Sequence, residues 1–391
     1  MTSVSRFWVG AALGVLIALT RPPAVHSAMT QVEVDEAMGR GYAAIDSQDV
    51  NGAMAAFESV IREAPGSARV PEAMSKLGHL QLRIGSSQAE GTLKSLAEAY
   101  PESPDALKAC WRLGGLNTRN RHYDDAKAAF LTASEHKATS SVDRGRARLE
   151  ASFVELMKFF ANEYYGKGKD GSPELVRSDA AQIKIEHLET ARKELEAIRS
   201  DYGKSKNPEL AAIADCGIGE IYLLGKTPHL AERAYWRAIR QYGDMPVALN
   251  TLARAGLGQA LYRQGKLQKA LEQYDLMLDN FVVGKVDGFE VATKSLRPAT
   301  LIWKAVVLHD LGKMDEALAA AQQAKAELGS ETDARSNELK AQAELWEGRL
   351  LRNTGKPAEA MAILQSVIDE HPGTQEALRA QSLLSELKGG N

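Results

Sequence analysis

Residues 212–239, AIADCGIGEIYLLGKTPHLAERAYWRAI, contain the pattern that decides the fold of this 391-residue chain. Gly219 lies 12 residues before Ala231, and Tyr235 and Ala238 follow Ala231 at spacings of four and three. Residues at these spacings lie on one face of a helix. The alanine leaves a flat place where a neighbouring helix can approach closely, and the larger residue fills the space beside it. The stretch therefore predicts two packed helices.

The same pattern recurs along the chain, which predicts a repeat architecture. A lone glycine inside a helix costs about 1 kcal/mol relative to alanine, so glycines at one place of a repeat indicate a tight crossing of two antiparallel helices. The second-helix pattern occurs at Ala53-Phe57-Val60, Ala89-Leu93-Leu96, Ala126-Phe130-Ala133, Ala191-Leu195-Ile198, Ala231-Tyr235-Ala238, Ala270-Tyr274-Met277, Ala317-Ala321-Ala324 and Ala360-Leu364-Val367. A small residue lies 12 or 11 positions upstream of most of these alanines, at Gly41, Gly78, Gly114, Gly219, Gly258, Ala305 and Gly348.

These units resemble the tetratricopeptide repeat, whose pattern is W-x2-L-G-x2-Y…A-x3-F…P. The step from Gly219 to Tyr222 matches G-x2-Y, Ala53 to Phe57 matches A-x3-F, and Leu113-Gly114 matches L-G. The tryptophan position is mostly replaced, and Trp111 lies one residue late. The resemblance covers roughly residues 32–388 and implies an all-α fold, a right-handed superhelical solenoid of antiparallel helix pairs.

The spacing between successive pattern alanines shows where residues are inserted between repeats, because each step exceeds the minimal unit of 34 residues. The 65-residue step predicts a long helix from Val142 to Tyr164, an exposed loop from Gly166 to Pro173, and a second long helix from Glu174 to Ser200. The expected parts are a signal peptide (1–28), three repeat units (32–137), an extended fourth unit with an insertion (138–203), further units (204–281), an inserted loop (282–298), further units (299–373) and a C-terminal capping helix (374–391).

The first 28 residues are typical of a secretory signal peptide. Arg6 precedes 14 apolar residues, Phe7 to Thr20, and Ser27-Ala28 supplies small residues at a plausible cleavage point. A helix of that length spans about 21 Å, which is less than the roughly 30 Å of the hydrocarbon core. We therefore expect export to the bacterial periplasm, with an uncleaved inner-membrane anchor as the alternative. Membrane contact is expected only through this segment.

Composition and motifs exclude several classes of function. The formal charge is −3, which is unlike the basic surface of a nucleic-acid binder. Only two cysteines are present, and no two of the histidines remaining after cleavage lie within five residues of each other. The sequence contains no HExxH, GxSxG, GxxxxGK[ST] or CxxC motif. We therefore predict no catalytic residues, no cofactor and no metal.

The first helices of this repeat family line an inner groove that binds peptides or protein segments. Aromatic and arginine side chains are the usual anchors of an interface. Among the positions expected to face inward, which include Glu220, Leu252 and Gln259, the candidate partner-binding residues are Trp111, Arg119, Tyr262, Arg263, His309, Arg349 and Arg352. Packing of Trp111 against the neighbouring unit is the alternative for that residue, and plain solvation is the alternative for the arginines.

The resulting hypothesis is a non-enzymatic protein–protein interaction scaffold of the bacterial cell envelope, which binds partner segments on the concave face of the solenoid. The alternative is an accessory or regulatory subunit of an envelope enzyme or secretion machine. An enzyme that uses the insertion at 139–188 is a third hypothesis, which is weak because that segment offers only His187 and scattered carboxylates.

Overall fold

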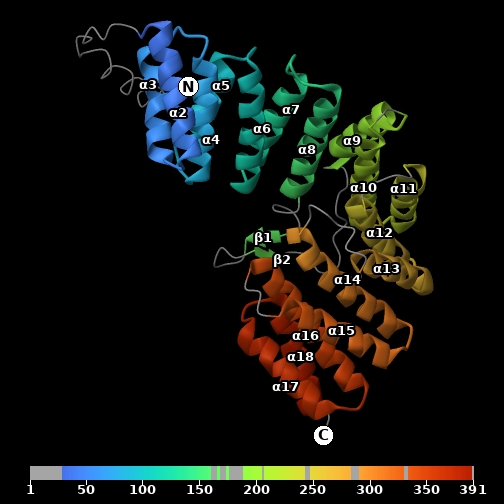
Figure 1. Ribbon diagram of the computed structural model, residues 1–391. Helices are drawn as coiled ribbons and strands as arrows, with labels where there is room; N and C mark the ends of the chain where they lie inside the picture. The colour runs from blue at the N-terminus through green and yellow to red at the C-terminus, as the bar shows by residue number, and fades with distance from the viewer. Residues whose placement is uncertain are drawn as a thin grey trace, which may run out of the picture. The chain divides into compact units, whose positions relative to one another are not determined.

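The computed structural model describes residues 29–159, 165–167, 173–175, 188–204, 207–242, 247–282, 290–329 and 333–389. These residues form α-helices and one pair of three-residue strands (Figure 1). The chain divides into two compact units, Met1–Ser140 and Ser141–Asn391. The prediction of a fold built from paired α-helices is confirmed.

Helices of the first unit form three successive pairs: α2 (Gln31–Asp46) with α3 (Val50–Glu63), α4 (Val70–Arg83) with α5 (Ala89–Ala99), and α6 (Pro104–Arg119) with α7 (Tyr123–Glu135). The N-terminus of α2 has a capping box, in which Thr30 accepts from the backbone of Glu33 and the Glu33 carboxylate accepts from the backbone of Thr30. Such a cap satisfies two of the free N–H groups at a helix start.

Helices of the second unit continue the same arrangement. Its helices are α8 (Ser141–Phe159), α9 (Glu189–Tyr202), α10 (Pro208–Leu224), α11 (Pro228–Gln241), α12 (Val247–Tyr262), α13 (Leu267–Val282), α14 (Glu290–Asp310), α15 (Met314–Leu328), α16 (Ala334–Asn353), α17 (Pro357–Glu370) and α18 (Gln375–Gly389). Each even-numbered helix from α8 to α16 pairs with the next, and α18 packs on α16 and α17. First helices also contact one another: α8 contacts α10, α10 contacts α12, and α14 contacts α16. These contacts place α8, α10 and α12 side by side in one layer, and α14 beside α16.

The repeat glycine lies against a large side chain in six of the eight pairs, and Gly145 on α8 approaches Tyr202 on α9 in the same way. A methyl group added at the glycine would lie only 2.5 to 2.8 Å from a side-chain carbon of the second helix. The six pairs are Gly41 with Phe57, Gly78 with Leu93, Gly114 with Phe130, Gly219 with Tyr235, Gly258 with Tyr274, and Gly348 with Leu364. The repeat glycine is therefore present because no side chain fits between the two helices.

The pair α14 and α15 meets the same requirement with two small residues. Ala305 replaces the glycine and Ala321 replaces the large residue, and both are fully buried. A methyl group on the first helix is accommodated when the facing side chain shrinks, because a protein interior has a fixed volume to fill.

A buried ion pair joins three consecutive helices of the second unit. The side chain of Asp215 on α10 has no exposed area, and Arg237 on α11 donates to both of its carboxylate oxygens, from Nε at 2.9 Å and from Nη2 at 2.5 Å. Arg199 on α9 lies 3.7 Å from the same carboxylate. Burial raises the pKa of Asp215, and the two guanidinium groups act against that rise.

The insertion differs from the sequence-based expectation. Glu174 belongs to strand β2 (Pro173–Leu175), which pairs antiparallel with β1 (Tyr165–Lys167), and the following helix α9 begins only at Glu189. The prediction of a helix from Glu174 is therefore wrong. Aromatic and aliphatic residues favour strands when a glycine-rich stretch separates them, and the helical spacing of the later residues concealed this. Helix α8 is described as far as Phe159, so the remainder of its expected length lies outside the described residues.

Two other expectations meet the limits of the described residues. Helix α14 begins at Glu290, so residues 290–298 of the expected inserted loop are helical, whereas residues 283–289 lie outside the described residues. The expected signal peptide, residues 1–28, lies outside them as well. Among the residues that are described, no helix is both long enough and apolar enough to span a membrane.

Two adjacent glycines of α6 test the packing role of the repeat glycine. A methyl group at Gly114 would meet the Phe130 ring at 2.5 Å, whereas one at Gly115 would meet nothing within 4 Å. We expect Gly115→Ala to stabilise the chain by up to about 1 kcal/mol through helix propensity. Gly114→Ala gains the same helix propensity, but it also incurs an overpacking cost of about 1–3 kcal/mol against the Phe130 ring. Urea midpoints should rank Gly114→Ala below Gly115→Ala, and equal midpoints would refute the packing role.

The buried ion pair supports a second stability test. Arg237→Met leaves the Asp215 carboxylate buried without its main partner, so we expect a loss of about 3–5 kcal/mol of unfolding free energy. The double variant Asp215→Leu with Arg237→Met should recover most of that loss, because a buried ion pair replaced by apolar residues is often neutral. Thermal or urea unfolding of both variants measures this, and a double variant no more stable than Arg237→Met would contradict it.

Candidate functional site

An apolar groove on the first-helix layer of the second unit is a candidate site. It encloses about 790 Å³ and lies between α8, α10 and α12, with Tyr235 reaching it from α11. This volume is in the range of pockets that hold small ligands or several side chains. We call it the Glu220 groove; its lining residues are Arg146, Phe153, Glu209, Leu210, Ile213, Cys216, Gly217, Glu220, Tyr235, Leu249, Leu252, Ala255, Gly256 and Gln259.

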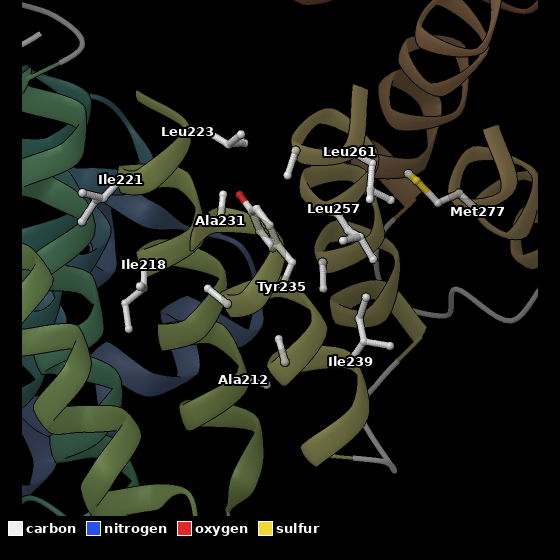
Figure 2. Close-up of a cluster of buried hydrophobic side chains, with 14 of the residues drawn as sticks. Ala212, Ile218, Ile221, Leu223, Ala231, Tyr235, Ile239, Leu257, Leu261 and Met277 are labelled. Atoms are coloured by element: carbon white, nitrogen blue, oxygen red, sulfur yellow. The ribbon is translucent and has the colours of Figure 1, made fainter. Parts of the chain in front are cut away.

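The Tyr235 ring fills the space between α10 and α12. A methyl group at Gly219 would approach it to 2.6 Å, and one at Gly256 to 2.1 Å. In Figure 2 the ring lies between the α10 side chains of Ile218 and Leu223 and the α12 side chains of Leu257 and Leu261. Both glycines are therefore needed for one aromatic ring to contact two first helices.

Glu220 places a carboxylate among these apolar side chains. The Tyr235 hydroxyl donates a hydrogen bond of 3.2 Å to its Oε2 atom. Burial raises the pKa of Glu220, and this hydrogen bond and the charge of Arg263 act in the opposite direction. Burial also raises the pKa of the neighbouring Cys216 to about 12, with the charges of Asp215 and Glu220 contributing. Cys216 is therefore a protonated thiol at neutral pH.

An ion pair and an exposed leucine complete the groove. Arg146 on α8 lies 3.6 Å from Glu209 on α10; Arg146 is exposed and Glu209 is half-buried. Leu252 on α12 is 49% exposed, one of the few large apolar side chains in the described residues that remain open to solvent. An exposed leucine beside a concave apolar surface marks a place where another molecule can bury area.

Polar and aromatic side chains form a second cluster near the ends of α12, α14 and α16, which we call the aromatic row. The Tyr262 hydroxyl donates to Oδ2 of Asp310 at 2.8 Å, and the Tyr262 ring contacts that of Trp303 edge to face. His309 contacts the Trp346 ring in the same way, and its two ring nitrogens lie 2.8 Å from Asp310 and 3.1 Å from the Asn353 amide. Burial and the Asp310 contact raise the pKa of Tyr262 to about 12.

A smaller hollow of about 350 Å³ adjoins the aromatic row, lined by Leu345, Trp346, Arg349, Arg379, Ser382, Leu383 and Glu386. The Arg349 guanidinium lies 5.0 Å from the centre of the Trp346 ring, a cation–π distance. Arg352 donates to Glu386 across the gap between α16 and α18 at 2.8 Å. The aromatic row contains Tyr262 and His309, and the hollow contains Arg349, whereas Arg352 contacts the hollow through Glu386.

Three family models of the tetratricopeptide repeat match the sequence, at residues 224–281, 298–323 and 342–374. The chain contains tetratricopeptide repeats. The matched segments lie in the second unit and include most of α11 to α13 and the aromatic row. No curated protein matches the chain at a significant level.

Solved structures resemble the chain at low sequence identity. The apo form of RapI is 13% identical, with 91% of this chain and 97% of that protein covered, and gives a TM-score of 0.51. A STAND signal-transduction ATPase with a tetratricopeptide repeat sensor, from Pyrococcus horikoshii, is 14% identical over 94% of this chain and 56% of its own length, with a TM-score of 0.54. A repeat protein from Parabacteroides merdae covers 91% of this chain and 99% of itself at 13% identity, with a TM-score of 0.40. These similarities concern the fold alone.

Of the other three candidate residues, Trp111 and Arg119 belong to the first unit, and Arg263 lines neither hollow. Trp111 contacts the Phe130 ring of its own repeat edge to face at 5.6 Å, and Arg119 is exposed at the end of α6. Arg263 follows the last residue of α12 and donates to the carbonyl oxygen of Leu223 at 2.6 Å. Trp111 therefore has a packing partner, although within its own repeat and not in the neighbouring unit that the alternative named.

Aromatic and arginine residues at inward repeat positions do not identify the Glu220 groove. Glu220, Leu252 and Gln259 occupy inward repeat positions, yet they are neither aromatic nor arginine, so they were not chosen. Gly256 carried a signal that could have helped, because it adds a second glycine two residues before the repeat glycine Gly258. Extra small residues on an inner helix indicate close approach of another group.

A histidine and two glutamates form another cluster, at the C-terminal end of α17. Glu344, Glu370 and His371 have side-chain oxygen or nitrogen atoms within 4.8 Å of one another. The His371 Nε2 atom lies 3.3 Å from the buried Glu344 carboxylate, and the Lys340 ammonium lies 3.7 Å from that of Glu370. A hydrogen bond and an ion pair therefore account for the cluster.

Thiol reactivity tests the environment of Cys216. A thiol with a pKa near 12 is almost wholly protonated, and the thiolate is the reactive form. We expect iodoacetamide to label native Cys216 about tenfold or more slowly than the same residue in urea. Cys110 is buried, with a raised pKa, and should behave in the same way. Mass spectrometry of labelled peptides measures both rates, and equal rates for Cys216 in the native and unfolded chain would contradict its placement.

Proposed function

We propose that this chain is a non-enzymatic protein–protein interaction scaffold of the bacterial cell envelope, which binds partner segments on its first-helix face. The observation that carries the proposal is the Glu220 groove, a largely apolar hollow bounded by three consecutive first helices. Tetratricopeptide repeats present such faces as extended binding surfaces.

The side chains of the groove favour binding over catalysis. Nucleophilic catalysis requires an activated group, such as a thiolate next to a base. The Cys216 thiol is held protonated by burial, and the Glu220 carboxylate accepts from the Tyr235 hydroxyl, whose own pKa burial raises. Apolar side chains with a few polar groups suit recognition of a protein segment.

Residues 1–28 are the basis for placing the protein in the envelope, because their pattern is that of a secretory signal. Fractionation of cells that express the full chain, with mass measurement of the mature protein, tests this. A periplasmic product beginning near Met29 supports export and cleavage. An intact chain in the cytoplasm would refute the envelope assignment and leave the binding proposal to its own test.

Two exposed leucines allow a matched test of the binding face. Leu252 lines the Glu220 groove on α12, whereas Leu276 on α13 is 44% exposed and lies outside it. We expect Leu252→Glu to abolish capture of the partner, because it places a charge in an apolar interface core. Leu276→Glu should leave capture unchanged. Affinity capture from envelope extract with quantitative mass spectrometry measures both.

Stability controls keep this result interpretable. Both substitutions replace a partly exposed leucine on a helix, so both variants should unfold within about 0.5 kcal/mol of the wild type. Full partner capture by folded Leu252→Glu would mean that the groove is not the binding site. If Arg349→Ala with Arg352→Ala then reduced capture, the aromatic row and its hollow would be the site instead.

A further inference from the structure

The chemistry of the occupant follows from the charges inside the Glu220 groove. Arg146 and Glu209 form an ion pair with each other. Glu220 is the other acidic side chain of the lining, and its contact is a neutral hydroxyl, that of Tyr235. The lining thus presents one carboxylate without a cation among its immediate neighbours.

The nearest positive charge is engaged elsewhere. Arg263 contributes to the electrostatics of Glu220, but its guanidinium donates to the Leu223 carbonyl at the end of α10. Within the described part of the chain, no ion pair joins Arg263 to Glu220. A carboxylate in an apolar site retains its charge at a cost unless water or a cation compensates it.

We infer that the Glu220 groove binds a protein segment in which a lysine or arginine side chain, flanked by apolar side chains, forms an ion pair with Glu220. This inference rests on the proposed function and specifies its ligand. The apolar flanks would cover Leu252 and Phe153, and the cation would replace the water that the segment displaces from the carboxylate.

Other occupants fit less well. An acidic segment would place like charges together in an apolar site, which is unfavourable. A wholly apolar segment would remove water from Glu220 and supply no partner, leaving a buried polar group unsatisfied. A basic and apolar segment avoids both costs and forms a charge-assisted hydrogen bond, a strong class of contact.

Binding of a cation should also release a proton. Burial raises the pKa of Glu220, and an ion pair favours the ionised form. The groups facing Glu220 are Cys216 on its own helix, Tyr235 from α11 and Arg263 beyond α12. Raised pKa values keep the Cys216 and Tyr235 side chains neutral, and arginine stays charged, so Glu220 alone changes charge below neutral pH.

The probe is a random-peptide display library, from which peptides are selected for binding to the whole mature chain, including both units. We expect enriched peptides to carry one lysine or arginine between apolar residues. For an enriched peptide, exchange of its basic residue for glutamine should weaken binding about tenfold or more, since hydrogen bonds to charged groups reach that size. Glu220→Gln should weaken the original peptide equally, and the two peptides should bind Glu220→Gln with similar affinity.

Glu232→Gln is the matched control, because Glu232 is a partly buried carboxylate on α11 that lies outside the groove lining and already has a cationic partner, Lys266. It should leave the affinity within about twofold. Affinity of the wild type for the basic peptide should rise as the pH increases above the usual range of a glutamate pKa, because Glu220 ionises there, and Glu220→Gln should remove this dependence. Calorimetry in two buffers of different ionisation enthalpy should detect the released proton.

The outcomes separate this inference from the proposed function. The inference would be overturned by enrichment of apolar peptides without a basic residue, or by unchanged affinity of Glu220→Gln. Peptide binding that depends on Leu252 would still support the groove as the binding site. Failure of every selected peptide to depend on Leu252 would overturn both. Melting temperatures close to the wild type would show that Glu220→Gln, which preserves side-chain shape and an acceptor for Tyr235, leaves the fold intact.

Discussion

The close contact between a first-helix glycine and a large second-helix side chain is the constraint on which the other features depend. It recurs in six pairs, and a single added methyl group would violate each of them. Helix propensity opposes glycine at these positions, so packing must outweigh a cost of about 1 kcal/mol at each. In the pair α14 and α15, alanine at the glycine position accompanies a small residue, Ala321, at the position of the large partner, and both are fully buried.

Departures from this rule locate the groove. Tyr235 satisfies the contact within its own repeat through Gly219, but it also meets Gly256 of the next first helix. Gly217 and Ala255 add further small residues on the same layer. Gly217 approaches Leu195 of α9 and Gly256 approaches Tyr235 of α11, so these small residues allow second-helix side chains to reach the layer that borders the hollow of about 790 Å³.

The paired helices could be predicted from the sequence because their contacts depend on local spacing. Ala231, Tyr235 and Gly219 identify their own neighbours by position alone. The groove could not be predicted in the same way, because it depends on how three successive repeats approach one another, and no local pattern encodes that distance. Side-chain direction was equally inaccessible: Arg263 occupies an inward position, yet its guanidinium binds the Leu223 carbonyl. Strand β2 was missed because three residues cannot establish an alternating pattern against a helical background.

One side chain links the packing of the repeats to the chemistry of the groove. The Tyr235 ring fills the contact with Gly219 and Gly256, while its hydroxyl donates to Glu220. The position of the carboxylate is therefore fixed by the same ring that sets the distance between α10 and α12. A ligand cation that pairs with Glu220 meets a carboxylate whose position is already fixed by buried, closely packed atoms. Few side chains therefore have to become ordered when the ligand binds. Preorganisation of this kind increases affinity by reducing the entropy lost on association. The repeat contact thus explains both why the chain folds and why a polar group can be held inside an apolar binding surface.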